Sequence, residues 1–180
     1  MTDLPIIPEA RLAHGNNYGP RGTALIDLII LHTTESSMES ALNWFADPNA
    51  RVSSHYVIGQ DGEVFQCVAE GDCAWHSGNF QYNLRSIGIE CEGHAAAADT
   101  WTAPLVASLI DLVVDICRRH PTITLDRAHV IGHAEVPDPR DPRRRGGAGG
   151  HVDPGPHCPF ETVIAEAQRR LTPPAAKEIA

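Results

Sequence analysis

Apolar residues recur along the chain in short blocks that polar and glycine-containing segments separate. Ile26 to Leu31 is a nearly continuous branched apolar run, short enough to be a strand covered on both faces. Val52 to Ile58 and Glu63 to Val68 are predicted to be two further strands, joined by a tight turn at Gln60-Asp61-Gly62. Ala128 to Ile131 predicts another buried strand.

Helical patterns lie between and after these strands. The first helix is predicted to start at Ser36, the N-cap of a capping box with Glu39, and to run to about Phe45. Thr102 is placed to cap a long amphipathic helix, and residues 159–171 are expected to form a closing helix. Because strands and helices interleave on what reads as a single sheet, the predicted fold class is α/β or α+β.

The remaining segments suggest the domain organisation. Residues 1–24 contain several prolines and glycines and are expected to be an irregular lead-in. Residues 25–171 form the single domain, because a chain of 180 residues is long enough to bury one hydrophobic core. Residues 172–180 are expected to be a flexible tail, either a frayed end or the linker stub of a longer protein.

Composition and charge exclude several classes of protein. Hydrophobic residues make up 42% of the chain and charged residues 21%, a composition typical of folded globular proteins. Its net charge of −9 would repel phosphate groups, so we expect no nucleic acid partner. No apolar run reaches the ~18 to 20 residues that span a membrane. Met1 to Pro5 has no features of a secretory signal. We therefore expect synthesis in the cytoplasm, no membrane insertion and a monomer.

The five cysteines favour free thiols. Their number is odd and none forms a Cys-x-x-Cys pair, which argues against a complete disulfide framework. Cys67 and Cys73 are close enough in sequence to pair if the compartment is oxidising.

Three residues of metal-ligand type stand in settings that would hold them still. His32 ends the apolar run at 26–31, and His133 follows the strand at 128–131. Asp153 precedes Pro154, which limits its backbone freedom. A catalytic zinc site needs three such ligands and one open position. Each residue alone also fits a hydrogen-bonded structural role, but their joint placement predicts a metal site.

The strand predicted at 86–92 carries two carboxylates. Its residues alternate, so Glu90 and Glu92 project to one face while Ile89 and Cys91 project to the other. Either glutamate could act as a base beside a metal, and periodicity does not separate them.

Six short motifs occur in order between about residues 25 and 160, and together they carry a resemblance to a known family. They are Ile30-Leu31-His32-Thr33-Thr34, Ser54-His55-Tyr56-Val57-Ile58 with Asp61-Gly62, Ala74-Trp75-His76-Ser77-Gly78, Ser86-Ile87-Gly88-Ile89-Glu90, Val130-Ile131-Gly132-His133 and Asp153-Pro154-Gly155-Pro156. The set resembles the zinc-dependent N-acetylmuramoyl-L-alanine amidases of the type-2 amidase family. That family includes anhydromuropeptide amidases, phage endolysins of the T7 lysozyme type and peptidoglycan recognition proteins.

The resemblance implies a fold and a set of site residues. The fold is a central mixed sheet flanked by helices, with a zinc groove on one face. His32, His133 and Asp153 match the ligands of one zinc ion, and Glu90 matches the general base. His151 falls where many members carry a lysine that stabilises the transition state.

The resemblance also implies an enzyme that cuts the amide between the lactyl group of N-acetylmuramic acid and L-alanine of the stem peptide. Its partners would be peptidoglycan or muropeptide fragments, and it would act in the cytoplasm or be released or exported to the cell wall. The alternatives are a non-catalytic peptidoglycan-binding module of the recognition-protein type and a zinc hydrolase of another amide.

Several site assignments stay open at the level of sequence. Cys158 also resembles a ligand, the cysteine used by the phage and recognition-protein branches, although Asp153 is preferred because His151 precedes it by two residues. Trp75, His76 and Asn83 are candidates for substrate binding. Residues 137–150 form a loop rich in proline, arginine and glycine that is either a lid or a passive insertion.

Overall fold

A six-stranded mixed sheet forms the centre of the molecule, and residues 8–172 are described by the computed structural model. The strand order is β1-β5-β4-β7-β3-β8, in which β4 and β5 pair antiparallel and the other neighbours pair parallel. The strands, in that order, are Glu9–Ala10, Val64–Gln66, Tyr56–Ile58, Ser86–Cys91, Leu28–Thr33 and Val130–Gly132. The prediction of a mixed sheet flanked by helices is confirmed.

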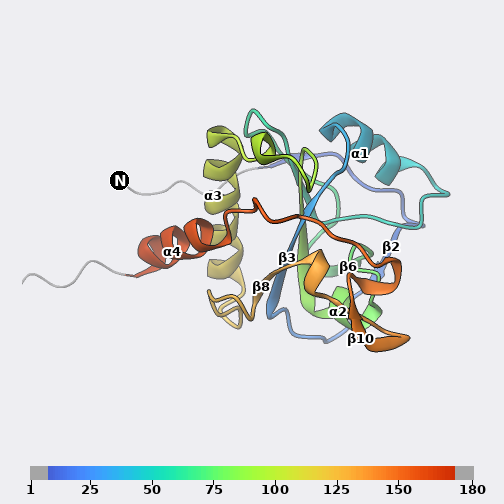
Figure 1. Cartoon of the computed structure of the whole chain (residues 1–180). Coiled ribbons are helices and arrows are strands. Elements are labelled where there is room, and N and C mark those ends of the chain that lie inside the picture. The colour runs from blue at the N-terminus through green and yellow to red at the C-terminus, as the bar shows by residue number, and fades with distance from the viewer. Residues whose placement is uncertain (1–7, 173–180) are drawn as a thin grey trace, which may run out of the picture.

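Helices cover the two faces of this sheet unequally (Figure 1). The long helix α3 (Ala103–Arg119) and the last helix α4 (Phe160–Leu171) lie on one side. The short helices α1 (Met38–Ala46) and α2 (Phe80–Arg85) lie on the other. No helix of the described residues is long and apolar enough to cross a membrane.

Strand alternation assigns each side chain of β3 and β7 to one of these sides. Ile29, Leu31 and Ile89 point into the larger core, which they share with α3 and α4. Ile30 and His32 point the other way, and His32 is the parallel-sheet partner of Glu90. The polar residues of the central strands therefore share the face on which α1 and α2 lie.

Some element boundaries differ from the sequence prediction. Helix α1 begins at Met38, and its N-cap is Ser37 rather than Ser36, because the Ser37 hydroxyl accepts from the Ser40 N–H. The second strand is confined to Tyr56–Ile58, since residues 52–55 are irregular. Thr102 caps α3 as predicted, accepting from the Leu105 N–H.

Two predicted irregular segments contain strands. Within the lead-in, Glu9–Ala10 joins the main sheet, and β2 (Tyr18–Pro20) pairs with β6 (Asp72–Ala74). Residues 1–7 and 173–180, and so nearly all of the predicted tail, lie outside the described residues.

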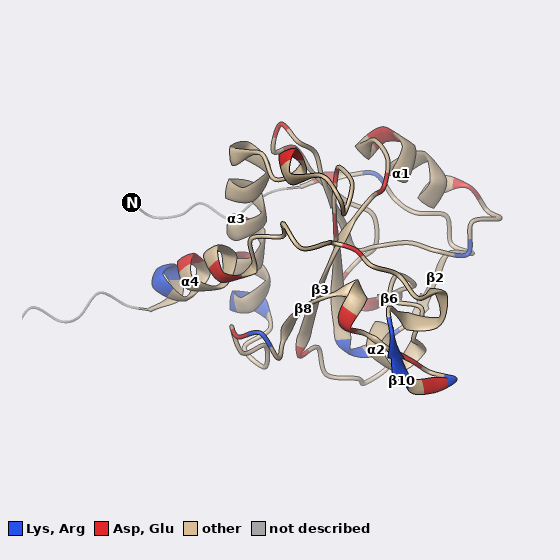
Figure 2. Cartoon of the chain, viewed as in Figure 1, with Lys and Arg blue, Asp and Glu red and all other residues tan. Residues whose placement is uncertain are grey.

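The segment predicted as a loop at 137–150 is ordered. It forms a hairpin of β9 (Pro137–Asp138) and β10 (Asp141–Arg145), followed by a 3-10 turn at Gly147–Gly149. Figure 2 shows basic and acidic residues side by side on this hairpin. Arg140 pairs with Asp138, and Arg143 pairs with Asp141. Local ion pairs and strand pairing thus hold a segment whose composition suggested a loop.

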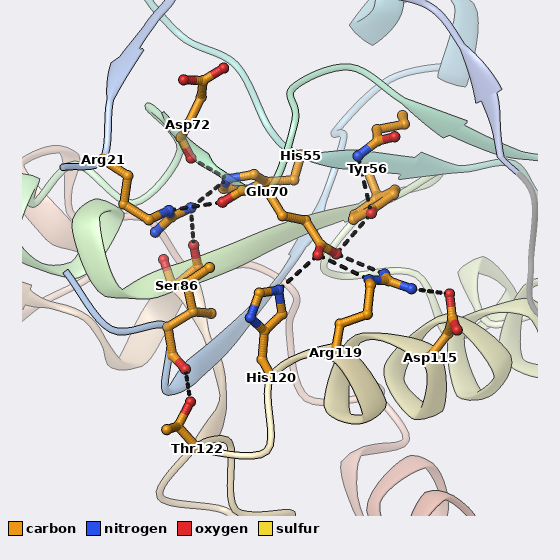
Figure 3. Close-up of polar contacts among 12 residues, drawn as sticks. Arg21, His55, Tyr56, Glu70, Asp72, Ser86, Asp115, Arg119, His120 and Thr122 are labelled. Carbon is orange, nitrogen blue, oxygen red and sulfur yellow. Dashed lines mark hydrogen bonds and ion pairs between the residues drawn. The ribbon is translucent and has the colours of Figure 1, made fainter. Parts of the chain in front are cut away.

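A network of polar side chains joins the C-terminal end of α3 to the sheet (Figure 3). The Glu70 carboxylate accepts hydrogen bonds from Tyr56 of β4 at 2.8 Å and from Arg119 at 2.8 and 3.0 Å. The His120 ring lies 2.7 Å from the same carboxylate. These contacts hold α3 in place over the sheet.

Candidate metal and catalytic site

The site is assembled where three parallel strands end. Since β3, β7 and β8 run parallel, their carboxyl ends meet at one edge of the sheet. His32 lies near the end of β3, Glu90 near the end of β7, and His133 directly after β8. Ligand sites of open α/β sheets form at such edges.

Asp153 reaches this edge from a distant part of the chain. The N–H of Ala134, next to His133, donates to the Asp153 carbonyl oxygen at 2.8 Å. A Cβ on Gly132 would lie 2.7 Å from the ring of Pro154, so a larger residue there would push the segment away. Glycine at 132 therefore brings the His133 and Asp153 segments together.

His32, His133 and Asp153 form a compact group of potential metal ligands, and one ligand atom from each lies within 4.8 Å of the others. His32 Nδ1 is 3.1 Å from one carboxylate oxygen of Asp153, and His133 Nδ1 is 3.3 Å from the other. Ligands at the Zn–N and Zn–O distances of a tetrahedral site would be about 3.4 Å apart. Two imidazoles and one carboxylate in this arrangement fit a catalytic zinc ion with its fourth position open.

The charge states of these residues suit a divalent cation. Burial lowers the pKa of His32 to about 4, so its ring is neutral at pH 7. Burial would raise the pKa of Asp153, but the close contacts of its carboxylate with the His133 and His32 rings outweigh it and hold that pKa well below its usual value. Neutral imidazole and ionised carboxylate are the forms that bind zinc.

Glu90 lies in β7 and Glu92 lies one residue past its end, and the two carboxylates have different surroundings. A Glu90 carboxylate oxygen is 4.0 Å from His32 Nδ1, and its side chain is 14% exposed. Burial raises the pKa of Glu90 well above its usual value, and the charges of Asp153 and Glu35 add to that effect. Glu92 instead accepts from the Met38 N–H at the start of α1 and from the Gln60 N–H, both at 2.9 Å. Of the two, Glu90 is the carboxylate placed beside the ligand group.

His151 stacks on the outer side of the group. Its ring is 4.3 Å from the His133 ring, with an angle of 16° between their planes. Its Nδ1 is 3.8 Å from Asp153, and its side chain is 53% exposed. A polar ring edge therefore borders the open side of the ligand group.

A pocket of about 500 Å³ opens above these residues. Trp75, half-buried, lines it together with Arg51 and with Trp44 of α1. Trp44 is 51% exposed, although it lies on a helix that buries Leu42 and Phe45. Sequence reasoning missed Trp44 and Arg51. An exposed tryptophan opposite the apolar face of the predicted helix was the available signal for Trp44.

His76 and Asn83 also line the pocket, but both are buried and their polar atoms contact the protein. The Asn83 side-chain oxygen accepts from the backbone N–H groups of His76 and Ser77. The His76 ring lies between His32 and Ser86. Burial lowers the pKa of His76 well below its usual value, and the nearby His32, His55 and His133 rings and Arg21 add to that effect, so its ring is neutral.

Cys158 lies outside the ligand group. It packs, half-buried, against the larger hydrophobic core. Burial raises the pKa of its thiol, which disfavours the thiolate that zinc requires. Cys67 and Cys73 are buried and free, as the sequence suggested.

A protein-family comparison agrees with this geometry. The family model described as N-acetylmuramoyl-L-alanine amidase matches residues 21–156, which contain every element of the site. The chain belongs to this amidase family. The resemblance seen in the six sequence motifs is thereby confirmed.

Individual amidases show the same relationship. N-acetylmuramoyl-L-alanine amidase A of Achromobacter lyticus is 42% identical over 92 residues, which are 51% of each chain. The 1,6-anhydro-N-acetylmuramyl-L-alanine amidase AmpD of Haemophilus influenzae is 33% identical over 66% of this chain and 60% of its own length. The chain thus spans about half of the first relative and three fifths of the second.

A solved structure shares the fold of this amidase domain. The crystal structure of an AmpD derivative superposes with a TM-score of 0.67 at 24% identity, over 92% of this chain and 97% of its own. The mixed sheet with helices on both sides is therefore the fold of that protein as well.

Proposed function

We propose that the chain is a zinc-dependent amidase that hydrolyses the bond between the lactyl group of N-acetylmuramic acid and L-alanine in peptidoglycan or its fragments. The observation that carries the proposal is the group of His32, His133 and Asp153 with Glu90 4.0 Å from His32, open to a pocket. The names of the relatives specify the bond. The proposal includes one zinc ion and a monomeric chain.

The three ligand residues would hold zinc in place and leave one position for water. When bound, zinc lowers the pKa of water toward ~7 and polarises the amide carbonyl. Zinc binds imidazole in its neutral form and carboxylate in its ionised form, so two histidines and one aspartate would give a ligand set with one negative charge and leave a net positive charge toward the substrate.

Glu90 would act as the general base. It takes a proton from the attacking water and delivers it to the departing amine of L-alanine. Burial and neighbouring carboxylates raise its pKa, whereas a cation among the adjacent ligands would lower it again. The two effects on the pKa of Glu90 therefore oppose each other.

His151 would stabilise the transition state. Its half-exposed ring borders the ligand group beside His133. An N–H of this ring can donate to the carbonyl oxygen as negative charge develops there.

Trp75, Trp44 and Arg51 would bind the substrate along the pocket. The indole rings offer flat apolar surface for a sugar ring or an alanine methyl group. Arg51 is exposed, and its guanidinium can pair with a carboxylate of the stem peptide. His76 and Asn83, which we also predict to contact substrate, would do so only from the buried inner wall.

Product analysis with metal control tests this function. The purified protein is expected to contain one zinc ion and to release peptides that begin with L-alanine, from intact sacculi, soluble anhydromuropeptides or both. A chelator should abolish release and added zinc should restore it. Binding to sacculi without any cleavage would instead identify a recognition module, and a chain that neither holds zinc nor cleaves either substrate would contradict the proposal.

A further inference from the structure

A chain of buried hydrogen bonds leads away from the metal-ligand group. His32 Nε2 lies 3.0 Å from His76 Nδ1, on the side of the His32 ring opposite Asp153. His76 Nε2 lies 3.2 Å from the Ser86 hydroxyl, which in turn lies 2.6 Å from the Tyr82 carbonyl oxygen. His32, His76 and Ser86 are at most 9% exposed.

The carbonyl at the far end determines the direction of every hydrogen bond in this chain. A carbonyl oxygen only accepts, so the Ser86 hydroxyl donates to Tyr82. The Ser86 oxygen then accepts from His76 Nε2–H. A neutral imidazole has one donor and one acceptor, so His76 Nδ1 accepts from His32 Nε2–H. His32 Nδ1 is left with a free lone pair.

This lone pair points at the place where a metal ion would bind. His32 Nδ1 faces an oxygen of Asp153 at 3.1 Å and an oxygen of Glu90 at 4.0 Å. The ionised Asp153 carboxylate is an acceptor as well, so a cation between its oxygen and His32 Nδ1 would satisfy both.

We propose that His76 is a positioning residue that fixes the tautomer of His32, so that Nδ1 is the nitrogen presented to the metal. This inference rests on the zinc site of the proposed function and deepens it. Ligating histidines usually donate their second N–H to a carboxylate or a carbonyl. Here His32 donates to His76, which is connected through Ser86 to the Tyr82 carbonyl oxygen of α2.

Gly88 in the middle of β7 supports this assignment. A Cβ at this position would lie 2.6–2.7 Å from ring atoms of His76. Glycine weakens the interior of a strand, so its presence is explained where another group must approach closely. The glycine of the Ile87-Gly88-Ile89 run provides the space that the His76 ring occupies.

Helix α2 and Arg21 hold the other end of the chain. Arg21 is 5% exposed and donates to the carbonyl oxygens of Asn83 and Ser86, at 3.1 and 3.0 Å. Figure 3 shows the contact between Arg21 and Ser86. Since Tyr82 and Asn83 lie in the same helix, this guanidinium fixes both the acceptor at the end of the chain and the residue that holds the His76 backbone.

Two substitutions separate the role of the His76 acceptor from that of its bulk. Asparagine keeps an acceptor close to the position of Nδ1 in a smaller side chain, whereas leucine keeps a similar volume and has no acceptor. Zinc affinity is measured by competition with a chromogenic chelator, and folding is checked by circular dichroism. We expect His76→Leu to bind zinc roughly 10- to 100-fold more weakly than the wild type, and His76→Asn to recover most of that loss.

Ser86→Ala provides a second test that leaves the His76 ring packed. It removes the acceptor for His76 Nε2–H, so the direction of the chain is no longer fixed. We expect a smaller loss of zinc affinity than in His76→Leu, with near-native thermal stability. This variant decides the matter if His76→Leu does not fold.

The alternative outcomes are distinct. Unchanged zinc affinity in both His76→Leu and Ser86→Ala, or equal losses in His76→Leu and His76→Asn, would overturn the inference. Native zinc affinity with a raised KM in His76→Leu would make His76 a substrate contact instead. A wild-type protein without zinc affinity would contradict the proposed function itself. The other outcomes would overturn only the role of His76.

Discussion

At the scale of single residues, Glu90 and Glu92 show how two carboxylates only two positions apart come to differ in function. Glu90 lies beside the ligand group, while Glu92 accepts from backbone N–H groups of Met38 and Gln60. A general base needs a free lone pair next to the reacting water in order to accept a proton from it. The side-chain alternation that groups the two residues does not reveal this difference.

Glu90→Gln is therefore expected to lower kcat by roughly 10²- to 10⁴-fold, with zinc content unchanged. Glu92→Gln is the matched control: it should retain most activity and lose about 1 kcal/mol of stability, because its contact at the start of α1 weakens. Steady-state kinetics, metal analysis and thermal unfolding of both variants measure these effects. The opposite distribution of activity would make Glu92 the base.

Two single substitutions test whether Asp153 or Cys158 is the third zinc ligand. Asp153→Asn should lower zinc affinity strongly, because an amide has no charge and binds zinc weakly. Cys158→Ser should leave zinc affinity unchanged, since its thiol packs against the hydrophobic core outside the ligand group. Competition with a chelator compares the two variants. Loss of zinc in Cys158→Ser would point to cysteine ligation.

At the scale of elements, the ends of parallel strands position the site, and short helices complete it. The edge formed by β3, β7 and β8 could be predicted from sequence, because His32, Glu90 and His133 each lie at or just past the end of an apolar run. Helix α2 could not, since six residues are too few to show a helical period. The Tyr82 carbonyl that accepts from Ser86 and the Asn83 side chain that accepts from the His76 N–H lie in this helix, so the sequence did not predict them either.

The start of α1 is a second case, in which the structure differs from the residue pattern by one position. The sequence predicts Ser36 as the cap, because Glu39 follows it three residues later. The structure uses Ser37, whose oxygen accepts from Ser40 N–H at 3.2 Å, while the Ser36 hydroxyl donates to the Thr34 carbonyl oxygen. Capping depends on backbone geometry that a residue pattern does not contain.

Ser37→Ala should therefore destabilise the protein by about 1 kcal/mol, the usual cost of removing a helix cap. Ser36→Ala, one residue earlier, should cost less, because its hydroxyl contacts only the neighbouring Thr34 and Ser37 carbonyl oxygens and no N–H of the helix. Denaturant unfolding of the two variants at neutral pH compares these values. A larger loss in Ser36→Ala would support the capping box predicted from the sequence.

At the scale of the whole molecule, the larger hydrophobic core and the candidate site lie on different sides of the sheet. Helices α3 and α4 bury the larger core on one side, and the ligand group and pocket lie on the other. The sequence predicted this fold class because its strands and helices are well separated. It did not predict the hairpin at 137–145, where proline and arginine obscure a strand pair held by Asp138 and Asp141.

The Glu70 network predicts how this assembly responds to acid (Figure 3). Burial would raise the pKa of Glu70, but hydrogen bonds from Arg119 and His120 outweigh it and lower that pKa from 4.5 to about 2. A carboxyl group with a lowered pKa in the folded state contributes stability above its unfolded pKa and loses it as the pH falls. The contribution is up to about 3 kcal/mol, complete above pH 4.5 and lost toward pH 2.

Glu70→Gln should therefore be less stable than the wild type at pH 6, and the two unfolding free energies should converge as the pH approaches 2. Glu63→Gln, at an exposed position outside the network, is the control and should follow the wild-type curve throughout. Denaturant unfolding from pH 2 to pH 7 in the presence of a chelator gives these curves without a contribution from metal release. If the unfolding free energies of Glu70→Gln and the wild type differed by a constant amount over this range, the charge of Glu70 would not be what stabilises the contact with the end of α3.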